Sequence, residues 1–69
     1  MGRPHFDERI AGRITYALQH LQPEGMTVTD MVRRTNLNKR TVMKYLKTLE
    51  KKEVVIHYQI GNYKVYRLK

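Results

Sequence analysis

Residues 27–55 read TVTDMVRRTNLNKRTVMKYLKTLEKKEVV, and this stretch decides the fold. Asn36 stands between two segments of helical spacing, and asparagine is the residue other than glycine that best tolerates the left-handed backbone of a sharp helix-to-helix turn. Before the turn, the sequence predicts a short helix over 30–35, with the side-chain oxygen of Thr29 as its N-cap. The turn is expected to place Leu37 between the two helices. Together these features predict a helix-turn-helix.

The segment after the turn is expected to form a helix over 38–52 with Asn38 as its N-cap. At about 100° per residue, one edge of this helix is apolar and faces the core. That edge consists of Val42, Leu46 and Leu49. The opposite edge is cationic, with Arg40, Lys44, Lys47 and Lys51 in line and Met43 and Thr48 beside them. Such a helix packs by one edge and presents a continuous positive charge on the other.

A first helix is predicted over 6–21, because apolar residues recur there at spacings of three and four. They are Phe6, Ile10, Ile14, Ala17, Leu18 and Leu21. Pro23 and Gly25 end this helix, since proline lacks a backbone donor and glycine tolerates left-handed angles. The residues 26–28 are expected to be short and extended.

The C-terminal segment predicts a β-hairpin. Two runs rich in β-branched and aromatic residues, 54–60 and 63–68, flank Gly61 and Asn62, and glycine supplies the positive φ of a tight hairpin turn. Pairing Ile60 with Tyr63 places Val55 opposite Leu68 and His57 opposite Tyr66 on a face suited to the core.

The other face of the hairpin carries Ile56, Tyr58, Ile60, Tyr63 and Val65. This is more apolar surface than a solvated face usually shows, and burial against a second subunit would explain it. We therefore expect a homodimer. The alternative is that the first helix covers part of this face.

The charge of the chain indicates an anionic partner. The 69 residues carry fourteen Lys and Arg against six Asp and Glu, a net charge of +8. Residues 1–35 hold five basic and four acidic side chains, whereas residues 36–69 hold nine and two. The absence of cysteine excludes a disulfide-stabilised scaffold. A chain of this length suits a single domain over 1–69. Because no secretory signal or membrane span is recognisable, we expect the protein in the cytoplasm, associated with DNA.

In the order of these elements and in the sequence of residues 27–55, the chain resembles small prokaryotic winged helix-turn-helix regulators of the MarR- and ArsR-like kind. Leu37, Val42, Leu46, Leu49 and Val55 stand where that family keeps core residues. Asn36 and Glu53 stand where the family usually has glycine. The resemblance implies an α+β fold of three helices and a two-stranded wing, and a transcriptional regulator whose partner is double-stranded DNA.

In such regulators the helix after the turn enters the major groove, so the resemblance assigns the DNA contacts to 38–52 and the hairpin tip. Arg40 is expected to contact guanine and Met43 a thymine methyl, with Lys39 and Lys44 also at the groove floor. The residues of this helix expected to contact phosphates are Thr41, Tyr45, Lys47 and Thr48, together with the capping residue Asn38. The hairpin tip is expected to contact the adjacent minor groove or its backbone through Asn62, Tyr63 and Lys64. Arg9, Arg13, Arg33 and Arg34 either reach flanking phosphates or are only solvated.

Three other functions stay open. The first is recognition of Z-DNA or RNA; Z-DNA winged helices carry an asparagine and a tyrosine where this chain has Met43 and Lys47. The second is a protein-interaction module of the replication or transcription machinery whose basic surface docks an acidic partner. The third is binding to nucleic acid without sequence preference. The dependence of affinity on salt separates DNA from a protein partner.

Catalysis and metal binding are not predicted. His5, His20 and His57 are far apart and no cysteine accompanies them. Glu50 and Glu53 are interpreted as ion-pair partners of Lys47 and Lys51 rather than as an acid–base pair. No motif for a nucleophile, a cofactor or a small-molecule effector is recognisable.

Overall fold

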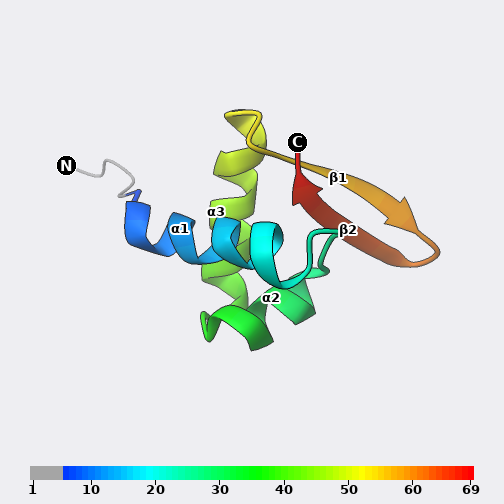
Figure 1. Cartoon of the computed structure of the whole chain (residues 1–69), viewed down its shortest axis with the longest axis horizontal. Helices are drawn as coiled ribbons and strands as arrows, with labels where there is room; N and C mark the ends of the chain where they lie inside the picture. The colour runs from blue at the N-terminus through cyan, green and yellow to red at the C-terminus, as the bar shows by residue number, and fades with distance from the viewer. Residues whose placement is uncertain (1–5) are drawn as a thin grey trace.

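The computed structural model describes residues 6–69 as three helices followed by a two-stranded antiparallel sheet. The elements in chain order are α1 (Glu8–Tyr16), the π-helical turn η1 (Ala17–Leu21), α2 (Val28–Thr35), α3 (Lys39–Lys51), β1 (Val55–Ile60) and β2 (Tyr63–Leu68). Figure 1 shows the helices crossing one another while the hairpin projects to one side of them. The α+β winged helix-turn-helix architecture predicted from the sequence is confirmed.

The first helix is shorter and less regular than its apolar spacing predicts over 6–21. The side chain of Asp7 accepts a hydrogen bond from the backbone N–H of Arg9 at 2.9 Å, so α1 begins directly after Asp7. From Ala17 onward the backbone follows the π pattern, and the N–H of Gln22 donates to the carbonyl of Ala17 at 3.0 Å. π-Helical turns are rare, and they occur frequently at functional sites.

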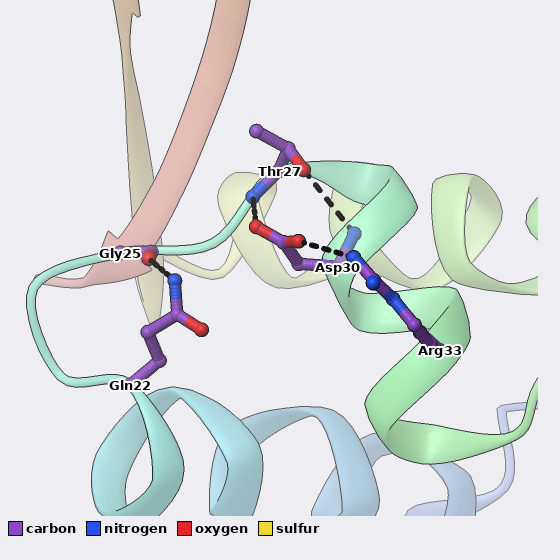
Figure 2. A network of polar contacts seen from close by, with 5 residues as sticks. All are labelled: Gln22, Gly25, Thr27, Asp30 and Arg33. Atoms are coloured by element: carbon purple, nitrogen blue, oxygen red, sulfur yellow. Dashed lines mark hydrogen bonds and ion pairs between the residues drawn. The ribbon is translucent and has the colours of Figure 1, made fainter.

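α2 begins two residues earlier than the sequence predicts, because Thr27 and not Thr29 is its N-cap. The backbone N–H of Asp30 donates to Thr27 Oγ1 at 3.2 Å, and the N–H of Thr27 donates back to Asp30 Oδ2 at 3.4 Å. Figure 2 shows this capping box and the guanidinium of Arg33, whose Nη2 lies 3.1 Å from Asp30 Oδ1. The box satisfies two backbone donors at the start of the helix, which a cap at Thr29 would leave open.

The turn between α2 and α3 has the predicted chemistry. Asn36 adopts the left-handed conformation with φ 60° and ψ 27°. Asn38 caps α3, because its side chain accepts a hydrogen bond from the N–H of Thr41 at 2.8 Å. Leu37 is half-buried against the core between the two helices. The helix-turn-helix is therefore built by two asparagines that the sequence identifies.

The core lies where α1, η1, α2 and α3 meet the start of β1. Its fully buried side chains are Ile14, Leu18, Met26, Met31, Val42, Leu46 and Val55. Leu49 is also buried, so the predicted apolar edge of α3 is confirmed. Within residues 6–69, no helix has the length and apolar character that crossing a membrane requires.

The hairpin register is the predicted one. Ile60 pairs with Tyr63, which places Val55 opposite Leu68 and His57 opposite Tyr66. Met26 extends the sheet by one residue, because its N–H and carbonyl exchange hydrogen bonds with those of Tyr66 at 2.8 Å. The wing is thus fixed to the chain between η1 and α2.

The loop before Met26 covers part of the second face of the hairpin. Tyr58 donates its hydroxyl hydrogen to the carbonyl of Glu24 at 2.9 Å. Gly25 is buried with φ +127°, and a Cβ there would lie 2.5 Å from Val65 Cγ1. Gln22 Nε2 donates to the Gly25 carbonyl at 2.9 Å, which holds the loop in place (Figure 2). Only a glycine at 25 allows the loop this close to the sheet.

Glu53 connects α3 to β1 with φ 63°, a left-handed conformation that is rare for residues other than glycine and asparagine. The backbone therefore has at 53 the conformation that suits the glycine usual in the resembling family. The Glu53 carboxylate lies 2.9 Å from Nζ of Lys69.

Candidate nucleic-acid interface

The exposed edge of α3 is cationic along its whole length. Its members all face solvent: Lys39, Arg40, Met43, Lys44, Lys47 and Lys51. Among residues 6–69, the ion pairs join other residues, and none of these cations has a carboxylate partner. The interpretation that Glu50 and Glu53 pair with Lys47 and Lys51 is wrong. The positive charge of this edge is therefore uncompensated by its own chain, which is the electrostatic arrangement that phosphate binding requires.

Glu50 instead connects α3 to the wing. Its Oε2 accepts a hydrogen bond from Nδ1 of His57 on β1. The His57 ring packs against Tyr66 on β2, with ring centroids 5.5 Å apart. Burial, and secondly the nearby negative charge of Glu50, raise the pKa of Tyr66 above its ordinary value. One carboxylate thus holds the helix edge and the hairpin in a fixed relation.

The hairpin tip presents polar and aromatic side chains to solvent. Asn62, Tyr63 and Lys64 are all exposed, and Tyr63 keeps 66% of its surface accessible. Gly61 supplies the positive φ of the turn, at +58°. Ile60, opposite Tyr63, is 55% exposed, so the apolar character of this face continues to the tip. The tip and the α3 edge are the two surfaces that the sequence assigns to DNA.

Tyr45 does not lie on the α3 edge. It is 5% exposed, and its hydroxyl oxygen accepts a hydrogen bond from the backbone N–H of Asp7 at 2.8 Å. Its ring stacks on Phe6 with centroids 5.2 Å apart. A phosphate contact by Tyr45 does not fit this placement. The spacing contained the signal, because Tyr45 lies three residues from Val42 and four from Leu49 and so continues the apolar edge.

The two threonines of α3 lie at the border of the edge. Thr41 and Thr48 are half-buried, and Thr48 Oγ1 donates to the carbonyl of Lys44 at 3.3 Å. Asn38 is exposed, but its side-chain oxygen is engaged in the cap. Asn38 therefore positions the start of the helix.

Arginines of α1 and α2 make contacts within their own chain. Arg9 Nε lies 3.6 Å from Asp7 Oδ1, and Arg33 is bound to Asp30 as described. Arg13 Nη1 donates to the carbonyl of Thr35 at 3.4 Å.

Of the three histidines, His5 lies outside the described residues, and so does Arg3. The ring of His20 packs against that of Tyr16 in a tilted arrangement, with centroids 4.7 Å apart. Within residues 6–69 no three side chains of metal-binding type come together.

Neither a protein-family model nor a curated protein sequence matches the chain. The apo Zalpha domain of zebrafish PKZ is 27% identical to it with a TM-score of 0.81, covering 88% of this chain and 92% of that one. The complex of PKZ Zalpha with ds(CG)6 is also 27% identical to this chain, with a TM-score of 0.80, and the match covers 90% of this chain and 97% of that one. MepR of Staphylococcus aureus is a transcription regulator of the multidrug efflux pump MepA. It is 23% identical, with a TM-score of 0.74, and the match covers 93% of this chain and 47% of that one.

The chain has the winged helix-turn-helix fold. The fold implied by the resemblance, first suggested by the order of elements and by residues 27–55, is confirmed. The chain spans about half the length of MepR, whose complex with DNA matches it with the same TM-score of 0.74.

Proposed function

We propose that this chain binds double-stranded DNA and regulates transcription, with α3 in the major groove and the hairpin tip on the flanking backbone or minor groove. The observation that carries the proposal is the uncompensated cationic edge of α3, placed on the helix that follows the turn. The matches to PKZ Zalpha in complex with ds(CG)6 and to MepR in complex with DNA support a DNA ligand.

The exposed side chains of α3 suit direct readout of bases. An α-helix fits the major groove, where each base pair presents a distinct pattern of donors and acceptors. Arg40 is proposed to donate two hydrogen bonds to guanine, and Met43, which is 51% exposed, to pack on a thymine methyl. Lys47 lies about two turns after Arg40 on the same edge and Thr41 lies at the border of that edge, and both are proposed at phosphates.

A homodimer on a pseudo-palindromic site is part of the proposal. One recognition helix reads only a few base pairs, and two copies related by a two-fold axis double the site. Tyr58 and Ile60 are 37% and 55% exposed on the hairpin, and a second copy is proposed to cover these side chains.

The test compares two double variants that remove equal charge. Replacing Arg40 and Lys44 by alanine is expected to weaken binding to duplex DNA by about 2–4 kcal/mol, roughly 30- to 1000-fold, and to lower the salt slope by about 1–2 units. Replacing Arg9 and Arg33 by alanine, on α1 and α2, is the matched control and is expected to change affinity little. Equal losses in the two variants would show that only net charge matters and would remove α3 from the proposal.

Sequence specificity is tested by selecting bound duplexes from random DNA. We expect half-sites repeated with two-fold symmetry, and their spacing reports the dimer. Recovery of unrelated sequences would leave a non-specific nucleic-acid binder. A salt dependence near zero would instead support the protein-interaction module.

The second candidate is recognition of the left-handed DNA form, and the match to the PKZ Zalpha complex with ds(CG)6 favours it. The α3 side chains do not, because Met43 and Lys47 replace the asparagine and tyrosine of Z-DNA winged helices. Titrating the protein into an alternating CG duplex decides between them. We expect the circular dichroism of the duplex to keep its right-handed form, and inversion of the spectrum would establish the second candidate.

A further inference from the structure

An open groove of about 470 Å³ is lined by residues of α1, η1 and the end of α2. Its lining includes Gly12, Arg13, Tyr16, Leu21, Arg34 and Thr35. None of the lining residues comes from α3 or from the wing. The groove is therefore a surface separate from the proposed DNA interface, and a molecule bound there leaves the α3 edge accessible.

The floor of the groove is apolar and its rim is cationic. Tyr16 and Leu21 are 58% and 44% exposed, large fractions for apolar side chains of a small fold. Packing against His20 holds the Tyr16 ring in place. The hydrogen bond from Arg13 to the carbonyl at the end of α2 fixes one guanidinium in the lining of the groove, and Arg34, which also lines it, is exposed. Among the described residues, no carboxylate lines the groove.

The backbone of the groove is also unusual. Leu21 belongs to η1, and π-helical turns are found frequently at functional sites. Gly12 lies in the middle of α1, where glycine weakens a helix, and a Cβ added to it would meet nothing within 4 Å. The space above α1 is thus open along the groove.

The net positive charge of the chain disfavours a second copy as the molecule that binds in this groove. The chain has a net charge of +8 and only six carboxylate side chains. Four of these carboxylates are already in ion pairs within their own chain, namely Asp7, Asp30, Glu50 and Glu53. DNA phosphates would suit the arginines but would leave Tyr16 and Leu21 without an apolar partner. An acidic protein segment satisfies both features.

We propose that this groove docks an acidic segment of another protein, with a large apolar side chain of that segment on Tyr16 and Leu21 and its carboxylates on Arg13 and Arg34. Guanidinium groups bind carboxylates through two parallel hydrogen bonds, and an aromatic or aliphatic anchor between them gives the contact its apolar core. The proposal does not depend on DNA binding, since the two surfaces share no residue.

The probe is a short synthetic peptide that alternates aspartate and glutamate with leucine and phenylalanine. Two control peptides carry lysine in place of the acids, or serine in place of the apolar residues. Titration into the isotope-labelled full chain, followed by backbone amide shifts, is expected to move the signals of Gly12, Leu21 and Arg34. Neither control peptide is expected to move them. Shifts confined to the α3 edge would show that the peptide only follows positive charge and would overturn the proposal.

Variants at Gly12 separate docking from folding. Substituting Gly12→Gln or Gly12→Glu adds side chains of nearly equal size at a helical position with open space, so both are expected to fold, as circular dichroism would confirm. Gly12→Glu places a carboxylate in the groove and is expected to weaken the acidic peptide about tenfold or more relative to Gly12→Gln. Equal affinities in the two variants would refute the charge complementarity. The affinity of both variants for duplex DNA is expected to equal that of the parent chain, which keeps the outcome distinct from any failure of DNA binding.

Discussion

Glu53 offers a direct measurement of backbone strain at the joint between the recognition helix and the wing. Its φ of 63° is a left-handed value, and its side chain makes one ion pair, to Lys69, with 73% of the side chain exposed. Glycine has no Cβ to clash in this conformation. Replacing Glu53 by glycine is therefore expected to relieve strain, whereas replacing it by alanine keeps the strain and removes only the ion pair.

The magnitude comes from the difference between the two variants. Both lose the contact with Lys69, so this contribution cancels. A residue with a Cβ costs about 1–2 kcal/mol in the left-handed region. Glycine loses about 0.5–1 kcal/mol more backbone entropy than alanine on folding. The Glu53→Gly chain is therefore expected to be more stable than Glu53→Ala by about 0.5–1 kcal/mol.

Thermal unfolding followed by circular dichroism is the assay. For a domain of 60–100 residues, 1 kcal/mol shifts the midpoint by about 4–8 °C, so we expect Glu53→Gly to melt roughly 2–8 °C above Glu53→Ala. Urea unfolding with an unchanged m value would confirm that the two variants differ in stability and not in the compactness of the denatured state. A glycine variant equal to or less stable than the alanine variant would refute the argument that residue 53 is strained.

Three further predictions concern the fixed parts of the fold. Thr27→Ala is expected to lower the free energy of unfolding by about 1 kcal/mol in urea, because it removes the cap of α2, and Thr29→Ala should change it little; equal effects would contradict the capping assignment. Gly25→Ala is expected to destabilise the chain by about 1–3 kcal/mol, because φ is +127° and the new Cβ would lie 2.5 Å from Val65 Cγ1; unchanged urea unfolding would show that the loop shifts freely. Burial raises the pKa of Tyr66 above its ordinary 10.0, so above that pH the unfolded chain releases its phenolic proton first and stability falls; Tyr66→Phe should lessen this loss in urea midpoints, and parallel pH profiles would contradict it.

Local chemistry explains why most of the fold could be predicted from the sequence. Asn36 and Asn38 each have one conformation that suits a turn or a cap, and both adopt it. The two-residue loop at Gly61 fixes the hairpin register, and a shift by one residue would move Val55 out of the core. The cationic edge of α3 follows from helical geometry alone. These features depend on residues within a few positions of one another.

The features that the sequence did not reveal depend on contacts between distant segments. Thr27 and Thr29 both carry a capping oxygen, and the choice falls on Thr27 because Met26 is bound to Tyr66, forty residues later. Tyr45 has a hydroxyl that suits a phosphate and a ring that suits a core, and Phe6 decides between them by stacking on it. The choice of Thr27 is not visible in local spacing, whereas the spacing of Tyr45 from Val42 and Leu49 already indicates the core.

Glu50 shows why the α3 edge stays wholly cationic although the helix carries a carboxylate. Its position on α3 faces the wing, where its Oε2 accepts a hydrogen bond from His57. The negative charge is thereby turned away from Lys47 and Lys51, which keep their charge for an external anion. The same contact fixes the hairpin against the helix, so the charge pattern and the relative position of the two candidate DNA surfaces have one cause. The fold of this chain matches both PKZ Zalpha and MepR. Proteins of this fold that bind different ligands must therefore differ in such side-chain arrangements and not in the fold.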